Sequence, residues 1–235
     1  MPNQALRFVR DLENLRHKRV EDEPLDPQEA LLRAWQSERL SRTYADLLEQ
    51  PRYRPACLFF LRDVYAARDF AQRDHDLEQM YAFVQRFVSE KLLRPLVLTV
   101  ELNTLTLSLD RRLLQVIVSQ LGMTDTITEE LYAGGYRLCD NYDERVHQID
   151  LIYEIGQALD GVVHSPWTGT ALRIAKRPAR RAGWGELADF LETGYEAFSR
   201  LDGADQFMNT VRRRELRILD RIYACDQNPF QFEDE

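Results

Sequence analysis

Residues 55–70, Pro-Ala-Cys-Leu-Phe-Phe-Leu-Arg-Asp-Val-Tyr-Ala-Ala-Arg-Asp-Phe, are the densest aromatic and apolar stretch of the chain, and charged residues flank them on both sides. At about 100° per residue, Phe60, Leu61 and Tyr65 fall on one wide helical face, whereas Phe59 projects to the opposite side. A helix that is apolar on more than one side must be covered on more than one side. The segment therefore predicts a central buried helix against which the remaining chain packs.

Helical spacing continues along most of the chain. Ten glycines and nine prolines are few for 235 residues, which favours long regular elements joined by short connections. No internal repeat divides the sequence, and no linker is long enough to require two domains. Segments compatible with further helices span residues 3–20, 26–49, 77–89, 91–120, 142–164, 184–201 and 205–226.

These patterns predict an all-α fold. We expect a single domain over residues 1–235, built as an irregular bundle of about nine helices. Residues 1–20 are expected to form a peripheral N-terminal helix, and residues 230–235 a frayed acidic tail.

Local signals predict where two of the helices begin and end. Thr126 and Glu129 have the spacing of a capping box, which predicts a helix start at Thr126. Ser165 and Pro166 suit the cap and first turn of a short helix that ends near residue 176. Residues 177–183 are then expected to form a basic connector.

Charge and cysteine usage exclude several classes of protein. The formal net charge of −8 argues against general attraction to nucleic acid or to an anionic membrane. The chain has no run of about 18 uncharged apolar residues, and its first 20 residues are charged throughout. Cys57, Cys139 and Cys225 are far apart and lack metal-type spacing, so reduced thiols are expected. A cytoplasmic location follows from these features.

The strongest metal-type signal is the pair Glu144 and His147, which has the i, i+3 spacing used by di-iron helical bundles. A complete site needs a second such pair, and the sequence has none. Both side chains also fall on the polar face of the 142–164 helix, away from the apolar residues. We therefore predict no metal site and assign no catalytic residue.

Two groups of basic residues remain. Arg212–Arg214, Arg217 and Arg221 alternate with Glu215 and Asp220 at helical spacing, which is typical of a salt-bridged surface. The other group is the strongest candidate site, because it concentrates five cations in nine residues of an acidic protein before a helix start. Its candidate residues for binding an anion or a partner are Arg173, Lys176, Arg177, Arg180, Arg181 and Trp184.

Two functional hypotheses follow, from different classes. The first is a non-enzymatic interaction or scaffold protein, which contacts another protein or a second copy of itself through residues 173–184. The second is a helical bundle that binds a cofactor or small molecule, such as haem or flavin, in a pocket beside Phe59, Phe60 and Tyr65. A single axial haem ligand leaves no spacing signature, so the sequence does not identify the cofactor.

The stretch Phe59-Phe60-Leu61-Arg62-Asp63-Val64-Tyr65 resembles the bacterial FFLEELY-motif proteins, named for the sequence Phe-Phe-Leu-Glu-Glu-Leu-Tyr. The chain departs from that motif at Arg62 and Asp63, where two glutamates are expected, and at Val64, where leucine is expected. The resemblance implies a single bacterial helical domain and transfers no catalytic residue. The loss of one carboxylate argues against acid-pair chemistry at this motif.

Overall fold

The computed structural model describes residues 26–64, 90–165, 167–181 and 185–231. These residues contain nine α-helices and one π-helical turn, without a strand, which confirms the predicted single all-α domain. The segments predicted as helices over 1–20 and 77–89, and most of the acidic tail, lie outside the described residues. The elements are α2 (Pro27–Thr43), α3 (Ala45–Glu49), α4 (Arg54–Phe59), η1 (Phe60–Val64), α6 (Glu90–Ser119), α7 (Glu129–Cys139), α8 (Tyr142–Val163), α9 (Thr168–Arg181), α10 (Gly185–Ser199) and α11 (Asp205–Tyr223).

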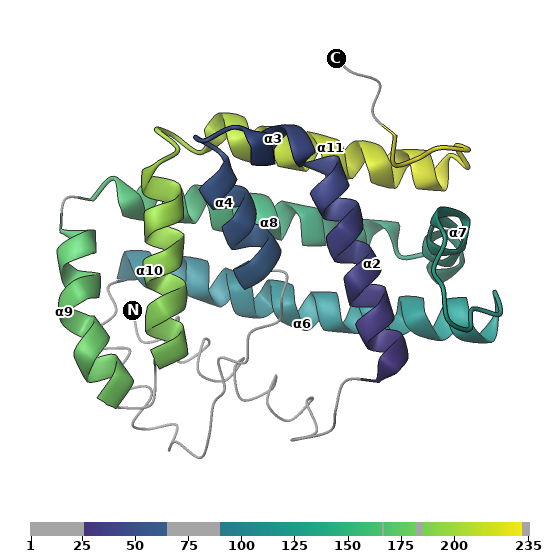
Figure 1. The fold of residues 1–235 in the computed structure, drawn as a ribbon, viewed down its shortest axis with the longest axis horizontal. Coiled ribbons are helices and arrows are strands. Elements are labelled where there is room, and N and C mark those ends of the chain that lie inside the picture. Colours follow the sequence, from purple (N-terminus) through teal and green to yellow (C-terminus); the bar gives the residue numbers. More distant parts are fainter. Residues whose placement is uncertain (1–25, 65–89, 166, 182–184, 232–235) are drawn as a thin grey trace.

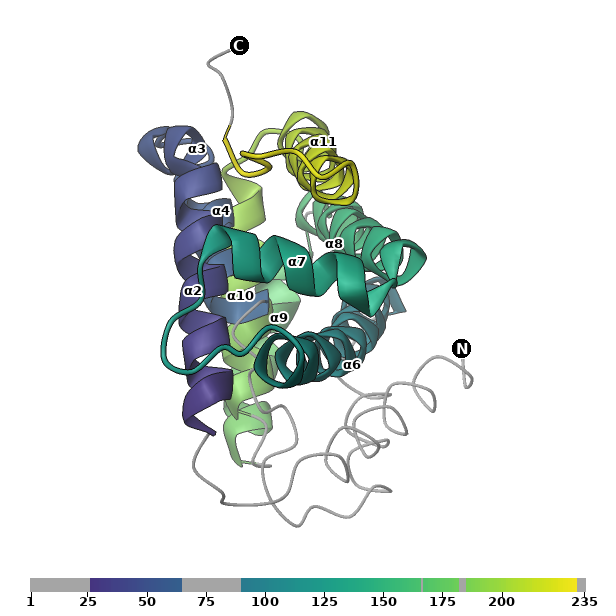
Figure 2. The ribbon, with the colours of Figure 1, turned by 90° about the vertical axis from the view of Figure 1, so that its right-hand side faces the viewer.

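The helices form two layers. Helices α6, α8 and α11 run side by side along the long axis of the molecule, and α2, α4, α9 and α10 cross them steeply (Figure 1). Viewed from the end, α7 lies across both layers and closes one end of the bundle (Figure 2). The space between α2, the three long helices and α7 is where the candidate site lies.

Helix boundaries follow local capping chemistry, with three departures from the sequence prediction. The Asp26 carboxylate accepts a hydrogen bond from the Gln28 amide at 2.9 Å, which fixes the predicted start of α2. The predicted helix over 26–49 is interrupted at Tyr44, whose backbone leaves the helical region and separates α2 from α3. The prediction of a cap at Thr126 is wrong, because Thr128 caps α7 and accepts from the Leu131 amide at 3.2 Å.

The third departure concerns the basic segment. The helix predicted to start at Ser165 and Pro166 and to end near residue 176 instead begins at Thr168 and continues through Pro178 to Arg181, so residues 177–181 of the expected connector are helical. The buried side chain of Ala179 and ion pairs from Lys176 and Arg180 to α10 hold this last turn in place. Tertiary contacts therefore override the helix-breaking tendency of Pro178.

The core consists of two apolar clusters. The first contains Phe59, which is 1 % exposed and packs its ring against Phe190, with ring centroids 5.2 Å apart. A Cβ atom on Gly194 would lie 3.0 Å from the Cζ atom of Phe59, so the ring occupies the space beside this glycine. The second cluster gathers around Leu113, Ile117 and Tyr132 at the α7 end. Of the central helix predicted over 55–70, the structure shows Ala56, Cys57, Phe59 and Phe60 buried, whereas residues 65–70 lie outside the described residues.

None of the helices in the described part of the chain combines the length and the apolar run that crossing a bilayer requires.

Candidate functional site

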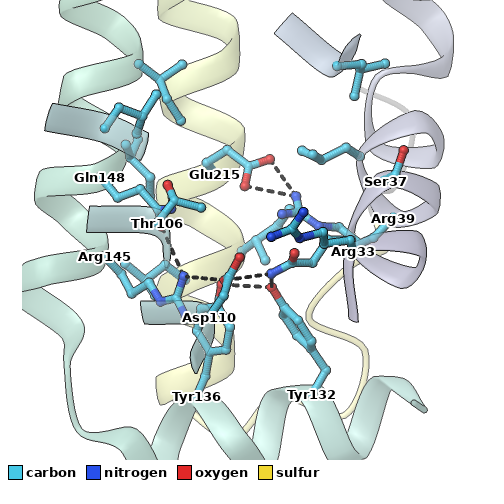
Figure 3. A pocket seen from close by; sticks show the side chains of 18 of the residues that line it. Arg33, Ser37, Arg39, Thr106, Asp110, Tyr132, Tyr136, Arg145, Gln148 and Glu215 are labelled. Atoms are coloured by element: carbon cyan, nitrogen blue, oxygen red, sulfur yellow. Dashed lines mark hydrogen bonds and ion pairs between the residues drawn. The ribbon is translucent and has the colours of Figure 1, made fainter. Parts of the chain in front are cut away.

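A cavity of about 470 Å³ lies where the two apolar clusters meet, between α2, α6, α7, α8 and α11. Protein interiors are close-packed, and voids much larger than a water molecule are few. A cavity of this size falls within the range of small-molecule sites. Figure 3 shows its polar wall: Arg33, Ser37 and Arg39 extend from α2, and they face Arg145 and Gln148 across the space.

Arg39 on α2 and Glu215 on α11 form a buried ion pair in this wall. Arg39 donates from Nη1 to both carboxylate oxygens of Glu215, at 2.7 and 2.9 Å. The Tyr44 hydroxyl donates to the same carboxylate at 2.7 Å. Arg39 and Glu215 are 7 % and 8 % exposed, so this pair joins α2 to α11 inside the protein. Close charge-assisted hydrogen bonds of this kind offset part of the desolvation of both groups.

A second arginine, Arg145 on α8, is only 3 % exposed but has a different environment. Its Nη1 donates to the Gln148 side chain at 3.1 Å, and its Nη2 donates to the Leu109 carbonyl at 3.4 Å. Its guanidinium lies 4.2 Å from the centre of the Tyr136 ring, a cation–π contact. The Asp110 carboxylate is 3.8 Å away, beyond hydrogen-bond distance. Arg145 is therefore a buried cation without a directly bonded carboxylate among the described residues.

Asp110 on α6 is held by a chain of neutral groups. Gln36 donates from Nε2 to Asp110 at 3.0 Å and lies 3.4 Å from the Tyr132 hydroxyl, which is 2.8 Å from that of Tyr136. Burial raises the pKa of Asp110 above its ordinary value, and the charge of Arg145 opposes that rise. Burial likewise raises the pKa of Tyr136 well above its ordinary value, so its hydroxyl stays neutral. The wall thus holds a carboxyl group that binds a proton more readily than an exposed aspartate.

The rest of the cavity combines excess positive charge with apolar surface. Among the described lining residues are three guanidinium groups, those of Arg33, Arg39 and Arg145, and two carboxylates. The wall is therefore positively biased within a protein of net charge −8. Apolar side chains cover much of the remaining surface: Leu40, Leu61, Leu102, Leu107, Ile149, Ile152, Ile218, Leu219, Ile222 and Phe230.

The sequence prediction missed these residues, although a signal was present. Taking Glu144 as zero, Arg145 lies at about 100° on the α8 wheel, within the apolar face. Taking Phe207 as zero, Glu215 lies at about 80° on α11, between Ile222 at about 60° and Met208 at about 100°. A charged residue in the middle of an apolar stripe must be buried and paired, or serve a site.

The prediction that Glu215 belongs to a salt-bridged surface is therefore wrong, because its carboxylate is buried against Arg39. The neighbouring arginines do form surface ion pairs, which agrees with the prediction for them. Arg212 pairs with Asp150, Arg214 with Asp46 and Arg221 with Asp226, each at 2.7 Å.

The basic segment lies on α9, at the opposite end of the bundle from α7 (Figure 1). Lys176 forms an ion pair with Glu192, and Arg180 forms one with Asp189 at 2.9 Å, so both contact α10. The other cations project to solvent, and Trp184 lies outside the described residues. Arg173, Arg177 and Arg181 are exposed, and Arg180 is exposed as well although it pairs with Asp189.

The pocket predicted beside Phe59, Phe60 and Tyr65 involves residues with different environments. Phe59 is enclosed by aromatic rings and does not line the large cavity. Phe60 borders a small hollow of about 20 Å³, and Tyr65 lies outside the described residues. Leu61, the next residue in the π-helical turn, does reach the large cavity.

The other candidate groups lie apart from the cavity. Glu144 and His147 are exposed on α8, and His147 is 3.4 Å from Glu101. Within the described ranges, no three His, Cys, Asp or Glu side chains are grouped as a metal site would require. Cys57 and Cys139 are buried and Cys225 is exposed, all as free thiols. Burial, followed by the charge of Asp46, raises the pKa of Cys57 to about 12.

Comparison with known proteins identifies a family. A family model described as a domain of unknown function, DUF8198, matches residues 15–229, so the chain belongs to that family. No curated protein and no solved structure matches the chain. The match neither tests the FFLEELY resemblance nor shows a bacterial origin, and both stay predictions.

Proposed function

We propose that this member of the DUF8198 family is a small-molecule-binding protein whose ligand occupies the cavity between α2, α6, α7, α8 and α11. The observation that carries the proposal is the placement of buried charges in the wall of a 470 Å³ cavity. Mixed apolar and polar linings of this size are typical of sites for metabolites and cofactors.

Energetics support a role in recognition. Burying a charged side chain carries a desolvation penalty of several kcal/mol, on the order of what its partner returns. Apolar side chains of similar volume would often stabilise a core equally well or better. Packing alone therefore does not account for the desolvation free energy of Arg39, Arg145 and Glu215. A site that must orient a polar ligand does require such buried charges.

The composition of the wall bears on the cofactor alternative. Of the described residues that line the cavity, none is histidine, cysteine or methionine, the side chains that most often ligate haem iron. The proposal therefore favours an organic ligand held by arginine, tyrosine and amide groups. It also moves the expected ligand from the pocket beside Phe59 to the neighbouring cavity that contains Leu61.

A blocking substitution tests the proposal. Ala34 is exposed at the α2 edge of the cavity and belongs to its lining, so tryptophan at this position should obstruct the space. Ala30 is exposed one turn earlier on the same helix and lies outside the lining, which makes Ala30→Trp the matched control. We expect compounds from a metabolite library to raise the melting temperature of the unmodified protein and of Ala30→Trp, but not of Ala34→Trp. A library without any stabilising compound, or equal responses in both variants, would contradict the proposal.

A second candidate function is the interaction or scaffold role, and the exposed face of α9 favours it. Arg173, Arg177 and Arg181 are spaced four residues apart, so they share one helical face. Ile174 on this face and Trp167 just before the helix are 69 % and 77 % exposed. Exposed arginines beside large apolar side chains are typical of protein interfaces, and an acidic protein surface would complement them.

This second candidate makes a separable prediction. Replacing Arg173, Arg177 and Arg181 with serine should leave the melting temperature nearly unchanged, because surface substitutions away from packed contacts have small effects. The same triple variant should lose co-purifying acidic proteins that the unmodified chain retains on an affinity column. Equal retention by both proteins would reject α9 as the contact surface.

A further inference from the structure

The wall of the cavity also indicates the chemical class of the ligand, an inference that rests on the function proposed above. We propose that the cavity binds an organic anion whose charged group replaces Asp110 as the counter-ion of Arg145, and that Asp110 takes up a proton as the anion binds. The ligand class is then a carboxylate, sulfonate or phosphate ester with an apolar body.

The two buried arginines differ in their carboxylate partners. Arg39 has a carboxylate at 2.7 Å, so its charge is compensated within the protein. Arg145 is buried more deeply, yet among the described residues its nearest carboxylate, that of Asp110, lies at 3.8 Å. The Nε–H groups of both arginines lack a hydrogen-bond partner within the described structure, so the two differ in their carboxylate contacts and not in this group. Arg145 is therefore the cation whose charge an incoming anion would stabilise most.

Asp110 faces polar and charged groups on the helices packed against it. From α2, Gln36 donates to its carboxylate, and Arg33 and Glu29 act on it through their charges with opposite signs. From α8, Arg145 is the nearest cation. From α7, the hydroxyls of Tyr132 and Tyr136 continue the hydrogen-bonded chain that begins at Gln36. Asp110 thus has one neutral hydrogen-bond partner and two cations, and burial works against its charge.

In these surroundings, a ligand anion can take the place of the Asp110 carboxylate as the counter-ion of Arg145. A second anion beside Arg145 would repel the Asp110 carboxylate and favour its protonated form. Protonation removes one negative charge as the ligand brings one, so the net charge of the wall is preserved. The proton comes from solvent, and the Asp110 hydroxyl can then donate to the ligand.

The rest of the lining suits the ligand's apolar body and its approach. Leu40, Leu61, Leu102 and Ile152 provide an apolar surface on the side of the first core cluster. Arg33 is only partly buried, so its charge can attract anions from solvent toward the cavity.

The exchange makes a directional prediction about pH. Between the pKa of Asp110 in the ligand-free protein and its higher pKa in the complex, each binding event takes up a proton, so affinity falls as the pH rises. The limiting slope is about ten-fold in affinity per pH unit. Below the pKa in the ligand-free protein, Asp110 is already protonated and the affinity becomes independent of pH. Asp110→Asn removes the competing charge, so we expect tighter anion binding and no pH dependence from this residue.

A matched pair of fluorescent probes tests the inference. 8-Anilinonaphthalene-1-sulfonate keeps its negative charge from about pH 5 to pH 8, so a pH dependence in that interval comes from the protein. N-phenyl-1-naphthylamine is the same molecule without the sulfonate group. We expect the sulfonate to bind the full chain at least about ten-fold more tightly than the neutral probe, an advantage that Asp110→Asn should increase. Ala34→Trp should abolish binding of both probes, whereas Ala30→Trp should not.

The outcomes separate the two proposals. If the two probes bind with equal affinity and neither binds Ala34→Trp, the cavity stays a binding site but its preference for anions is overturned. Unchanged or weaker sulfonate binding by Asp110→Asn would overturn the exchange of counter-ions. If neither probe binds, the cavity does not admit molecules of this size, and the proposed function fails with the inference.

Discussion

Arg39 and Arg145 lie in the wall of one cavity, and both are more than nine-tenths buried, but their partners differ. Arg39 meets Glu215 at 2.7 Å, and Tyr44 completes the carboxylate's hydrogen bonds. Arg145 meets neutral groups, an aromatic face and a carboxylate 3.8 Å away. We call Arg39 and Glu215 the closed pair, because they are directly hydrogen-bonded, and Arg145 and Asp110 the open pair, because no direct hydrogen bond joins them.

The difference shows how one fold can separate a structural use of buried charge from a functional one. A closed pair holds two helices together, and it loses stability when either member is removed. An open pair contributes less to stability, because its carboxylate loses hydration on burial without gaining a direct hydrogen bond to the cation. It retains the ability to bind another anion. The α2–α11 pair and the α6–α8 pair should therefore respond differently to substitution.

The largest effect is expected at the closed pair. Glu215→Gln would leave the buried Arg39 charge without a counter-ion, and such losses cost about 3–5 kcal/mol. Urea unfolding would measure the change in the free energy of unfolding. Asp46→Asn provides the control, because the Arg214–Asp46 pair on the surface has equally short contacts but is worth at most about 1 kcal/mol.

An apolar double variant sharpens that test. Arg39→Met combined with Glu215→Leu removes both charges, so stability should recover most of what the single substitution loses. If the double variant is less stable than Glu215→Gln, the pair is not a simple charge pair, and the comparison with Arg145 fails.

A smaller effect is expected in the tyrosine chain. Tyr136→Phe removes a hydroxyl that lies 2.8 Å from that of Tyr132 but keeps the ring beneath Arg145. The loss of one buried hydrogen bond should reduce the free energy of unfolding by about 1 kcal/mol. Thermal unfolding followed by circular dichroism would measure it, and a loss comparable to that of Glu215→Gln would contradict the order proposed here.

The smallest effect on stability is expected at the open pair. Asp110→Asn keeps the shape and an acceptor for Gln36, so the free energy of unfolding should change by no more than about 1 kcal/mol at neutral pH. Because the folded pKa of Asp110 is raised, the folded state binds its proton more tightly than the unfolded state. The carboxyl therefore loses stability as the pH rises from the unfolded pKa through the folded one. Relative to the unmodified protein, Asp110→Asn should gain stability across that interval, and a relative loss would reject the open-pair description.

Most of the fold could be predicted from sequence because helix formation depends on local spacing. The apolar periodicity over 91–120 and 142–164 matches α6 and α8 closely. Pro95 lies inside α6, as the prediction for 91–120 allowed, whereas Pro178 lies inside α9 although a connector was expected there. Helix ends depend on caps and on neighbours, so Thr128 and the extension to Arg181 required the structure.

The candidate site was less predictable, because it depends on pairs far apart in the chain. The positions of Arg145 and Glu215 on apolar faces could be found from helical wheels, yet their partners could not. Arg39 and Glu215 come from α2 and α11, at opposite ends of the described sequence. The sequence predicted a site on α9 instead, because five cations in nine residues are visible in the sequence, whereas the burial of a single charged residue depends on the fold.

The contact between Phe59 and Gly194 has a consequence for how this family can vary. The ring occupies volume that a side chain at position 194 would need, so the two positions share one fixed space. A side chain at 194 therefore requires the ring at 59 to shift or to be replaced by a smaller group, although the positions lie on α10 and α4. Gly194→Ala paired with Phe59→Leu should therefore fold better than Gly194→Ala alone, which makes the two residues a compensating pair.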